Sequence, residues 1–243
     1  MFHNFFPASS DKKKVVLSFS GGKDSILTLY KLINSGEYTV VALLTTLDPD
    51  NKVLMHGFDL ALLEQQALSL RIPLHKVTIP KVEGESKYAD RMKGELEGFK
   101  TNGVMHVAYG DIFLEEVRKF REEKLSIVSM TSIFPLWGRD TKSIAEEFIA
   151  LGFKAVITCV NTKLIPIDWI GKEFDREFLA YLAVHSIDPC GENGEFHTFV
   201  YAGPIFTEEI KYQFDWNTPL IHNEFYACVA KPLETTHKEA LKS

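Results

Sequence analysis

Residues 20–25 are the segment of this chain best suited to bind a phosphate group. They are Ser20, Gly21, Gly22, Lys23, Asp24 and Ser25. Glycines allow positive φ and a close approach of an anion, while serine hydroxyls, a lysine and the N–H groups at the start of a helix attract negative charge. Asp24 could hold Mg²⁺ among phosphates or cap the helix. The glycine that opens a Walker A loop is missing, so the segment predicts a different pyrophosphate-binding loop; a plain Gly-rich turn is the alternative.

A second polar segment, residues 188–199, is dense in carboxylates and glycines. Its candidate site residues are Gly191, Glu192, Asn193, Gly194, Glu195, His197 and Thr198. Two neighbouring carboxylates raise one another's pKa and could bind Mg²⁺, position an amine or act as a general base. His197 adds a group that titrates near neutral pH. The alternative interpretation is a solvated surface turn.

Two further segments carry candidate residues for a substrate cleft. Asp111 follows an apolar run at the edge where a parallel sheet binds ligands, and Glu115 and Arg118 follow it on one helix face. This face lines the cleft or, alternatively, carries a helix cap and surface ion pairs. Trp137 and Arg139 offer a ring for stacking and an anion-binding guanidinium, although a lone tryptophan such as Trp137 is more often a core residue.

The composition is that of a water-soluble globular protein, with 243 residues, 45% hydrophobic and 25% charged. Its net charge of −6 disfavours nonspecific attraction to nucleic acid or anionic lipid. The three cysteines, Cys159, Cys190 and Cys228, are too widely spaced for a disulfide framework or a zinc site, which fits a reducing compartment. With no signal-like start and no apolar run of the roughly 20 residues that a membrane helix needs, a cytoplasmic location is expected.

Apolar runs alternate with helical patterns over the first two thirds of the chain. The expected strands are 15–19, 39–46, 74–79, 104–109, 126–130 and 154–160, and the expected helices are 24–33, 58–71, 86–101, 112–124 and 141–151. This alternation indicates an α/β fold, with an open, mostly parallel sheet and helices on both faces. Ligands then bind beyond the carboxyl ends of the strands.

The pattern changes after residue 160. A helix near 173–183 and strands near 197–201 and 224–230 predict a small α+β C-terminal elaboration. The expected units are an N-terminal tail (1–13), a nucleotide-binding domain (14–160), a substrate-side elaboration (161–233) and a polar tail (234–243).

The SGGKDS segment resembles the SGGxDS fingerprint of the PP-loop, or N-type ATP pyrophosphatase, superfamily. The resemblance implies a Rossmann-like PP-loop domain at residues 14–160 that cleaves ATP between its α and β phosphates. A substrate oxygen then becomes adenylated, and the loop holds the leaving pyrophosphate. ATP and Mg²⁺ are therefore expected.

Residues 188–199, together with 135–138 (PLWG) and 203–206 (GPIF), resemble the pattern of the diphthine–ammonia ligase family from Lys14 to Phe206. Members of that family amidate the carboxylate of diphthine, a modified histidine on elongation factor 2. The resemblance implies that residues 20–25 bind the ATP phosphates and that the motif after residue 190 belongs to the substrate side. It also places Met55 and His56 beside the adenosine, although a lone surface histidine is the other interpretation.

Two departures separate this chain from the eukaryotic and archaeal ligases. His197 stands where they usually have a second glutamate, and Asp111 stands in a Gly-Asp-Ile sequence where they commonly have Gly-Ala-Ile. Both variants resemble a bacterial-type subgroup labelled adenine nucleotide α-hydrolase-like. Because diphthamide is an archaeal and eukaryotic modification, the identity of the carboxylate substrate stays open.

We predict an AMP-forming amide ligase. The expected catalytic residues are Lys23, Asp111, Glu192, Glu195 and His197, with Asp24 as a metal ligand. The expected partners are a carboxylate-bearing substrate, such as modified elongation factor 2, free ammonium and a second copy of the chain, but not nucleic acid. The alternatives are a PP-loop enzyme that modifies a small metabolite, a cofactor or RNA, and a nucleotide sensor without turnover.

Overall fold

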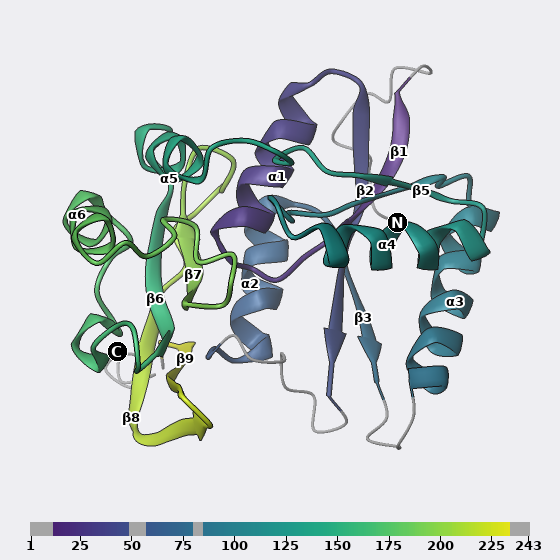
Figure 1. Ribbon diagram of the computed structural model, residues 1–243. Coiled ribbons are helices and arrows are strands. Elements are labelled where there is room, and N and C mark those ends of the chain that lie inside the picture. Colours follow the sequence, from purple (N-terminus) through teal and green to yellow (C-terminus); the bar gives the residue numbers. More distant parts are fainter. Residues whose placement is uncertain (1–11, 49–56, 80–84, 234–243) are drawn as a thin grey trace, which may run out of the picture.

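Two β-sheets with helices packed on them make up this computed structural model, which describes residues 12–48, 57–79 and 85–233 (Figure 1). The first sheet is parallel and has the strand order β3-β2-β1-β4-β5. Its strands are β1 (Lys13–Ser18), β2 (Tyr38–Leu47), β3 (Leu74–Thr78), β4 (His106–Ala108) and β5 (Thr131–Ile133). The predicted Rossmann-like α/β sheet is confirmed.

The helices of this sheet divide between its two faces. They are α1 (Lys23–Asn34) and α2 (Leu60–Leu70) on one face, and α3 (Glu85–Thr101) and α4 (Glu115–Ile127) on the other. Along β1, Val15 and Leu17 pack with α1 and α2, whereas Val16 packs with Leu96 of α3 and Leu125 of α4. Alternate side chains thus enter two cores, which is why the strand is apolar without interruption.

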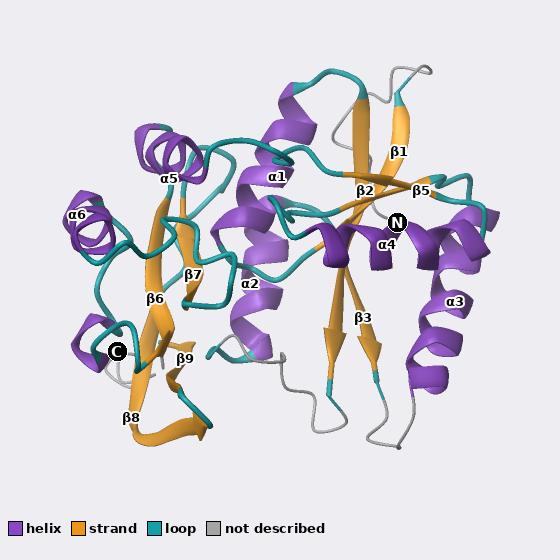
Figure 2. Cartoon of the chain, viewed as in Figure 1, coloured by secondary structure: helices purple, strands orange, loops and turns teal. Residues whose placement is uncertain are grey.

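The second sheet is antiparallel and has the strand order β7-β6-β9-β8. Its strands are β6 (Lys154–Asn161), β7 (Phe196–Ala202), β8 (Tyr212–His222) and β9 (Phe225–Pro232), and its other elements are α5 (Thr141–Ala150), η1 (Ile167–Trp169) and α6 (Arg176–Val184). Figure 2 shows α1 and α2 between the two sheets, with α5 and α6 on the far side of the second one. One apolar core runs through these layers.

The sequence analysis is wrong about two strands and misses a third. The expected strand at 126–130 is wrong, because α4 continues to Ile127 and the chain turns at Ser129, which has a φ of 55°. The run 154–160 does not extend the parallel sheet, since β6 is buried on both faces and pairs with antiparallel neighbours. Strand β8 went unrecognised because Asp215, Asn217 and Pro219 interrupt its apolar pattern.

The remaining fold predictions concern the membrane and the tails. Within the described ranges, no helix has the length and the apolar character that a membrane crossing requires. Residues 1–11 and 234–243, which make up most of the two expected tails, lie outside the described residues.

Gln66 of α2 connects the two sheets beneath the phosphate loop. The side chain is fully buried, and its Nε2 donates to the carbonyl oxygens of Gly21 (2.9 Å) and Val200 (2.6 Å). The N–H of Val200 in turn donates to Gly21 O at 3.1 Å. A buried amide at this point therefore fixes strand β7 against the loop.

We expect Gln66→Leu to lower the free energy of unfolding by about 2–4 kcal/mol, because it leaves two buried carbonyl oxygens without this donor. Urea unfolding measures the change. Gln65→Leu is the matched control, since Gln65 is the preceding residue of α2 and is only half-buried. Equal stabilities of the two variants would contradict this role of Gln66.

Candidate active site

The phosphate loop connects β1 to α1 at the carboxyl edge of the parallel sheet. In the strand order β3-β2-β1-β4-β5, the chain moves outward in opposite directions from β1 and β4, and ligands bind at such a switch point. Gly22 is the N-cap of α1 and supplies no side-chain acceptor to the first turn. The positive end of α1 therefore faces the cavity in front of it.

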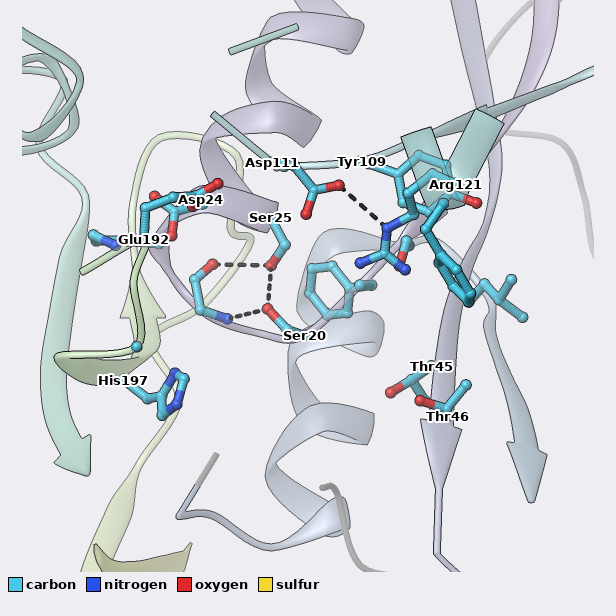
Figure 3. Close-up of a pocket in the computed structure, with 18 of the residues that line it drawn as sticks. Ser20, Asp24, Ser25, Thr45, Thr46, Tyr109, Asp111, Arg121, Glu192 and His197 are labelled. Carbon is cyan, nitrogen blue, oxygen red and sulfur yellow. Dashed lines mark hydrogen bonds and ion pairs between the residues drawn. The ribbon is translucent and has the colours of Figure 1, made fainter. Parts of the chain in front are cut away.

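Hydroxyl groups hold the shape of the loop from inside. Ser20 Oγ lies 3.2 Å from Ser25 Oγ, and Ser25 Oγ donates to Gly22 O at 2.9 Å (Figure 3). The Gly22 N–H points to Ser20 Oγ at 3.4 Å. These contacts place two hydroxyls beside the start of the helix, where both can bind a phosphate oxygen.

Gly21 lies at a crowded position where a larger residue would be strained. Its φ is +76°, and a Cβ atom there would lie 2.5 Å from Gln66 Oε1 and 2.7 Å from Leu63 Cδ1. The loop backbone thus rests directly on α2. This contact requires glycine for both conformation and space.

A cavity of about 570 Å³ opens in front of the loop. Its wall combines the loop with the end of β2 at Thr45 and Thr46, the segment 109–111 after β4, parts of α3 and α4, and the segment from Cys190 to Thr198. The second sheet therefore contributes one side of a cavity that the first sheet begins. The Lys23 N–H connects the two sheets at this point by donating to Thr198 Oγ1 at 3.1 Å.

Lys23 is nearly buried, with 4% of its surface exposed, and its ammonium is already engaged. Nζ lies 2.8 Å from Asp24 Oδ2 and also donates to the carbonyl oxygen of Cys190. The rings of Phe174 and Phe196 lie 5.8 Å and 5.2 Å away. Burial alone would lower the pKa of Lys23, but Asp24 and the other charges around it hold this pKa above its ordinary value, so the ammonium stays charged.

Glu192 lies at the point where the two halves of the cavity meet. Its Oε1 accepts from the Ile112 N–H at 2.7 Å, and its own N–H donates to Asp188 Oδ2 at 2.8 Å. Burial raises the pKa of Glu192 to about 7, against the effect of the Ile112 N–H, and the charges of Asp24 and Asp111 add to the rise. Such a carboxylate can exchange a proton near neutral pH.

Asp24 is the best candidate ligand for Mg²⁺. Its Oδ1 is buried and has no hydrogen-bond partner among the described residues. Those residues contain no group of three or more His, Cys, Asp or Glu side chains arranged to hold a metal. A site made of one carboxylate and substrate phosphates is common for Mg²⁺, so Asp24 fits this ion.

The structure brings eleven of the predicted site residues into the cavity wall. They are Ser20, Gly22, Lys23, Asp24, Ser25, Asp111, Gly191, Glu192, Gly194, His197 and Thr198. Glu195 lies outside the wall, and its Oε1 accepts from Asn193 Nδ2 at 3.0 Å. Met55 and His56 lie outside the described residues.

Five predicted substrate residues lie outside the cavity wall, namely Asn193 and the four residues Glu115, Arg118, Trp137 and Arg139. Glu115 is exposed, and Arg118 covers the ring of Trp137 at 4.7 Å. The guanidinium of Arg139 pairs with Glu147 at 2.7 Å. The α4 face that was expected to line the cleft is therefore occupied by surface interactions at this end of the helix.

Arg121 is one of several cavity residues that the sequence analysis missed. It lies one turn after Arg118 and lines the cavity. Its Nε lies 3.2 Å from Asp111 Oδ2, and its guanidinium lies 4.6 Å from the centre of the Tyr109 ring. One signal was available: Arg121 precedes Leu125, the buried residue of α4, by four positions, so both lie on the face that turns toward the sheet.

The comparisons with known proteins find relatives along most of this chain. The model of the diphthamide synthase N-terminal domain matches residues 13–129, and that of the diphthamide synthase C-terminal domain matches residues 140–225. The chain is 27% identical over 223 residues to a diphthine–ammonia ligase of Danio rerio, covering 81% of this chain and 85% of that protein. The ligases of Rattus norvegicus and Homo sapiens are 25% and 26% identical, each with coverage of 81% and 82%.

We expect Gly21→Ala to weaken nucleotide binding and to lower the free energy of unfolding by about 2–4 kcal/mol, through backbone strain and the contacts with Gln66 and Leu63. Gly36→Ala is the matched control, because Gly36 also has a positive φ of 74° but no atom within 4 Å of its Cβ position. It should cost about 1 kcal/mol. Calorimetric titration with ATP and thermal unfolding measure both effects, and equal losses would show that the contact under the loop is unimportant.

Glu192→Gln should change the pH dependence of stability. Because the folded-state pKa of Glu192 is raised from 4.5 to about 7, the unfolded state loses this proton first as the pH rises. The free energy of unfolding of the wild type should therefore fall relative to that of the variant as the pH rises from 4.5 to about 7. The fall should be on the order of 1 kcal/mol, because the group is partly solvated, and the difference should stay constant at higher pH.

Urea unfolding at a series of pH values measures this difference. The control is Glu115→Gln, which removes an exposed carboxylate outside the cavity wall. Parallel pH curves for the wild type and Glu192→Gln would refute the raised pKa.

Proposed function

Because this chain belongs to the diphthamide synthase family, we propose that it is an ATP-dependent ligase that converts a substrate carboxylate into an amide with ammonia and releases AMP and pyrophosphate. The observation that carries the proposal is the contact between the phosphate loop and the second sheet. The Lys23 N–H donates to Thr198 and its ammonium donates to the Cys190 carbonyl oxygen, so the phosphate loop and the polar segment 188–199 share one cavity. ATP cleavage and substrate amidation can then take place in a single site.

In the first step, a substrate carboxylate oxygen attacks the α-phosphorus of ATP, the bond from this phosphorus to the bridging oxygen breaks, and pyrophosphate leaves. Negative charge grows on the leaving group. The first turn of α1 and the hydroxyls of Ser20 and Ser25 are placed to stabilise this charge, and fixed donors of this kind contribute strongly to catalysis. Asp24 would hold Mg²⁺, which would neutralise further phosphate charge.

In the second step, the ammonia nitrogen attacks the activated carbonyl carbon, the bond to AMP breaks, and the nitrogen gives up a proton. Glu192 lies beside Asp24 in the cavity, and its ionised form can attract ammonium, which loses a proton to become the attacking ammonia. Glu192, with its pKa near 7, is suited to accept the proton. Cys190 is unsuited to a nucleophilic role, because burial raises the pKa of its thiol and this thiol donates a hydrogen bond to Thr141 O at 3.2 Å.

The substrate that the relatives' names indicate is diphthine, a carboxylate on a protein. A cavity that opens in front of the loop and is walled on one side by the second sheet suits a side chain presented by a macromolecule. Elongation factor 2 bearing diphthine is therefore the first substrate to test.

We expect the purified chain to release AMP and pyrophosphate from Mg²⁺-ATP when ammonium and diphthine-bearing elongation factor 2 are both present. Asp24→Asn should lower this rate by at least 100-fold, because the metal ligand is lost. Ion-exchange chromatography of the nucleotides and a pyrophosphate assay measure the products.

Three other outcomes would change the proposal. AMP release with a different carboxylate, and none with the factor, would keep the ligase chemistry and replace the substrate. ADP and phosphate as products would exclude adenylation. Tight ATP binding with no cleavage across a broad panel of carboxylates would favour a nucleotide sensor.

A further inference from the structure

One aspartate, Asp188, organises the turn that leads from α6 into β7. Three consecutive main-chain N–H groups donate to it. Those of Cys190 and Glu192 reach its two carboxylate oxygens at 3.4 Å and 2.8 Å, and that of Gly191 reaches its carbonyl oxygen at 3.0 Å. Asp188 is half-buried and lies outside the cavity wall. Any effect of this carboxylate on the site must therefore pass through the turn.

The other residues of the turn leave it little conformational freedom. Pro189 has a restricted φ and no N–H group. Gly191 has a φ of +67°, and a Cβ atom there would lie 2.9 Å from Cε1 of Phe196. Residues 188–192 thus suit one conformation, and the carboxylate supplies the acceptors that this conformation needs.

The same turn carries two groups that contact the first half of the chain. The carbonyl oxygen of Cys190 accepts from the Lys23 ammonium, and Glu192 Oε1 accepts from the Ile112 N–H at 2.7 Å. The Lys23 ammonium in turn lies 2.8 Å from Asp24 Oδ2. Two contacts that join the halves of the cavity therefore begin within four residues of Asp188.

We propose that Asp188 is a positioning residue whose carboxylate holds the Cys190 carbonyl and the Glu192 side chain in place at the cavity. The inference rests on the proposed function, in which Glu192 attracts ammonium and accepts a proton. It adds a residue that acts on this step through the main chain of the turn.

The role calls for a carboxylate. Both oxygens of an ionised aspartate accept hydrogen bonds, whereas asparagine has one accepting oxygen and an NH₂ group that only donates. In Asp188→Asn, one of the two N–H groups on the side chain would therefore face a donor. The turn can relieve this only by moving its main chain, which displaces the groups that it carries.

Asp175 provides a matched control. It is the N-cap of α6, and its Oδ1 accepts from the N–H groups of Glu177 at 2.9 Å and Phe178 at 3.0 Å. Like Asp188, it is half-buried, lies outside the cavity wall and binds two N–H groups through its carboxylate. Asp175→Ala therefore removes the same kind of contact at the start of α6 instead of beside the phosphate loop.

The first measurement is amide hydrogen exchange, followed by NMR in the full chain without nucleotide. We expect the Ile112 N–H to exchange at least tenfold faster in Asp188→Ala than in Asp175→Ala, because Glu192 is no longer held as its acceptor. The Phe178 N–H should show the reverse and exchange faster in Asp175→Ala. Asp188→Asn should give an intermediate rate at Ile112, and it replaces the alanine variant if that variant does not fold.

Two results would overturn the proposal. One is equal exchange of the Ile112 N–H in the wild type and the Asp188 variants. The other is a parallel increase at Ile112 and Phe178 in Asp188→Ala, because that pattern indicates a general loss of stability.

The second measurement is AMP release at varied ammonium and ATP concentrations. We expect Asp188→Ala to raise the KM for ammonium at least tenfold relative to Asp175→Ala. The KM for ATP should stay within threefold, because Ser20, Ser25 and the first turn of α1 keep their contacts. An unchanged KM for ammonium in an active Asp188→Ala would contradict the role.

Failure of the proposed function gives a different result. If the exchange at Ile112 follows the expectation while the wild type yields no AMP with any carboxylate, Asp188 still holds the turn and the ligase reaction is the part that is wrong.

Discussion

The N-cap of α1 is Gly22, which supplies no side-chain acceptor, and the rest of the site depends on this. The Lys23 N–H is bound by Thr198 Oγ1, and the positive end of the helix faces the cavity, where an anion can bind favourably. The parallel sheet puts this helix end at its switch point, and Gly21 lets α2 support the loop from behind. The second sheet then closes the cavity through Thr198 and the Cys190 carbonyl.

The charges around this helix end are arranged so that like charges are separated. Lys23 keeps its ammonium between Asp24 and the Cys190 carbonyl, which limits the repulsion among Asp24, Glu192 and bound phosphates. Burial raises the pKa of Glu192 to about 7, so near neutral pH this group carries only part of a full negative charge. On the other side of the loop, the guanidinium of Arg121 is paired with Asp111, so positive and negative groups alternate around the cavity wall.

The sequence was sufficient for the parts of the site that depend on local order. The strand, Gly-rich turn and helix around residues 20–25 were predicted in place, because the buried run and the glycine pair are consecutive in the chain. Segment 188–199 was recognised by its composition. Contacts between distant segments could not be predicted: β6 shows the same uninterrupted burial as a parallel strand, and the choice between Arg118 and Arg121 depends on how α4 is rotated against the sheet.

The central claim is that a carboxylate oxygen attacks ATP in a cavity that the two sheets share. The most direct measurement is to label the substrate carboxylate with a heavy oxygen isotope and to determine the mass of the nucleotide product after turnover with ammonium. The account predicts that one labelled oxygen appears in the phosphate of AMP and that the pyrophosphate is unlabelled. Unlabelled AMP, or ADP in its place, would contradict it.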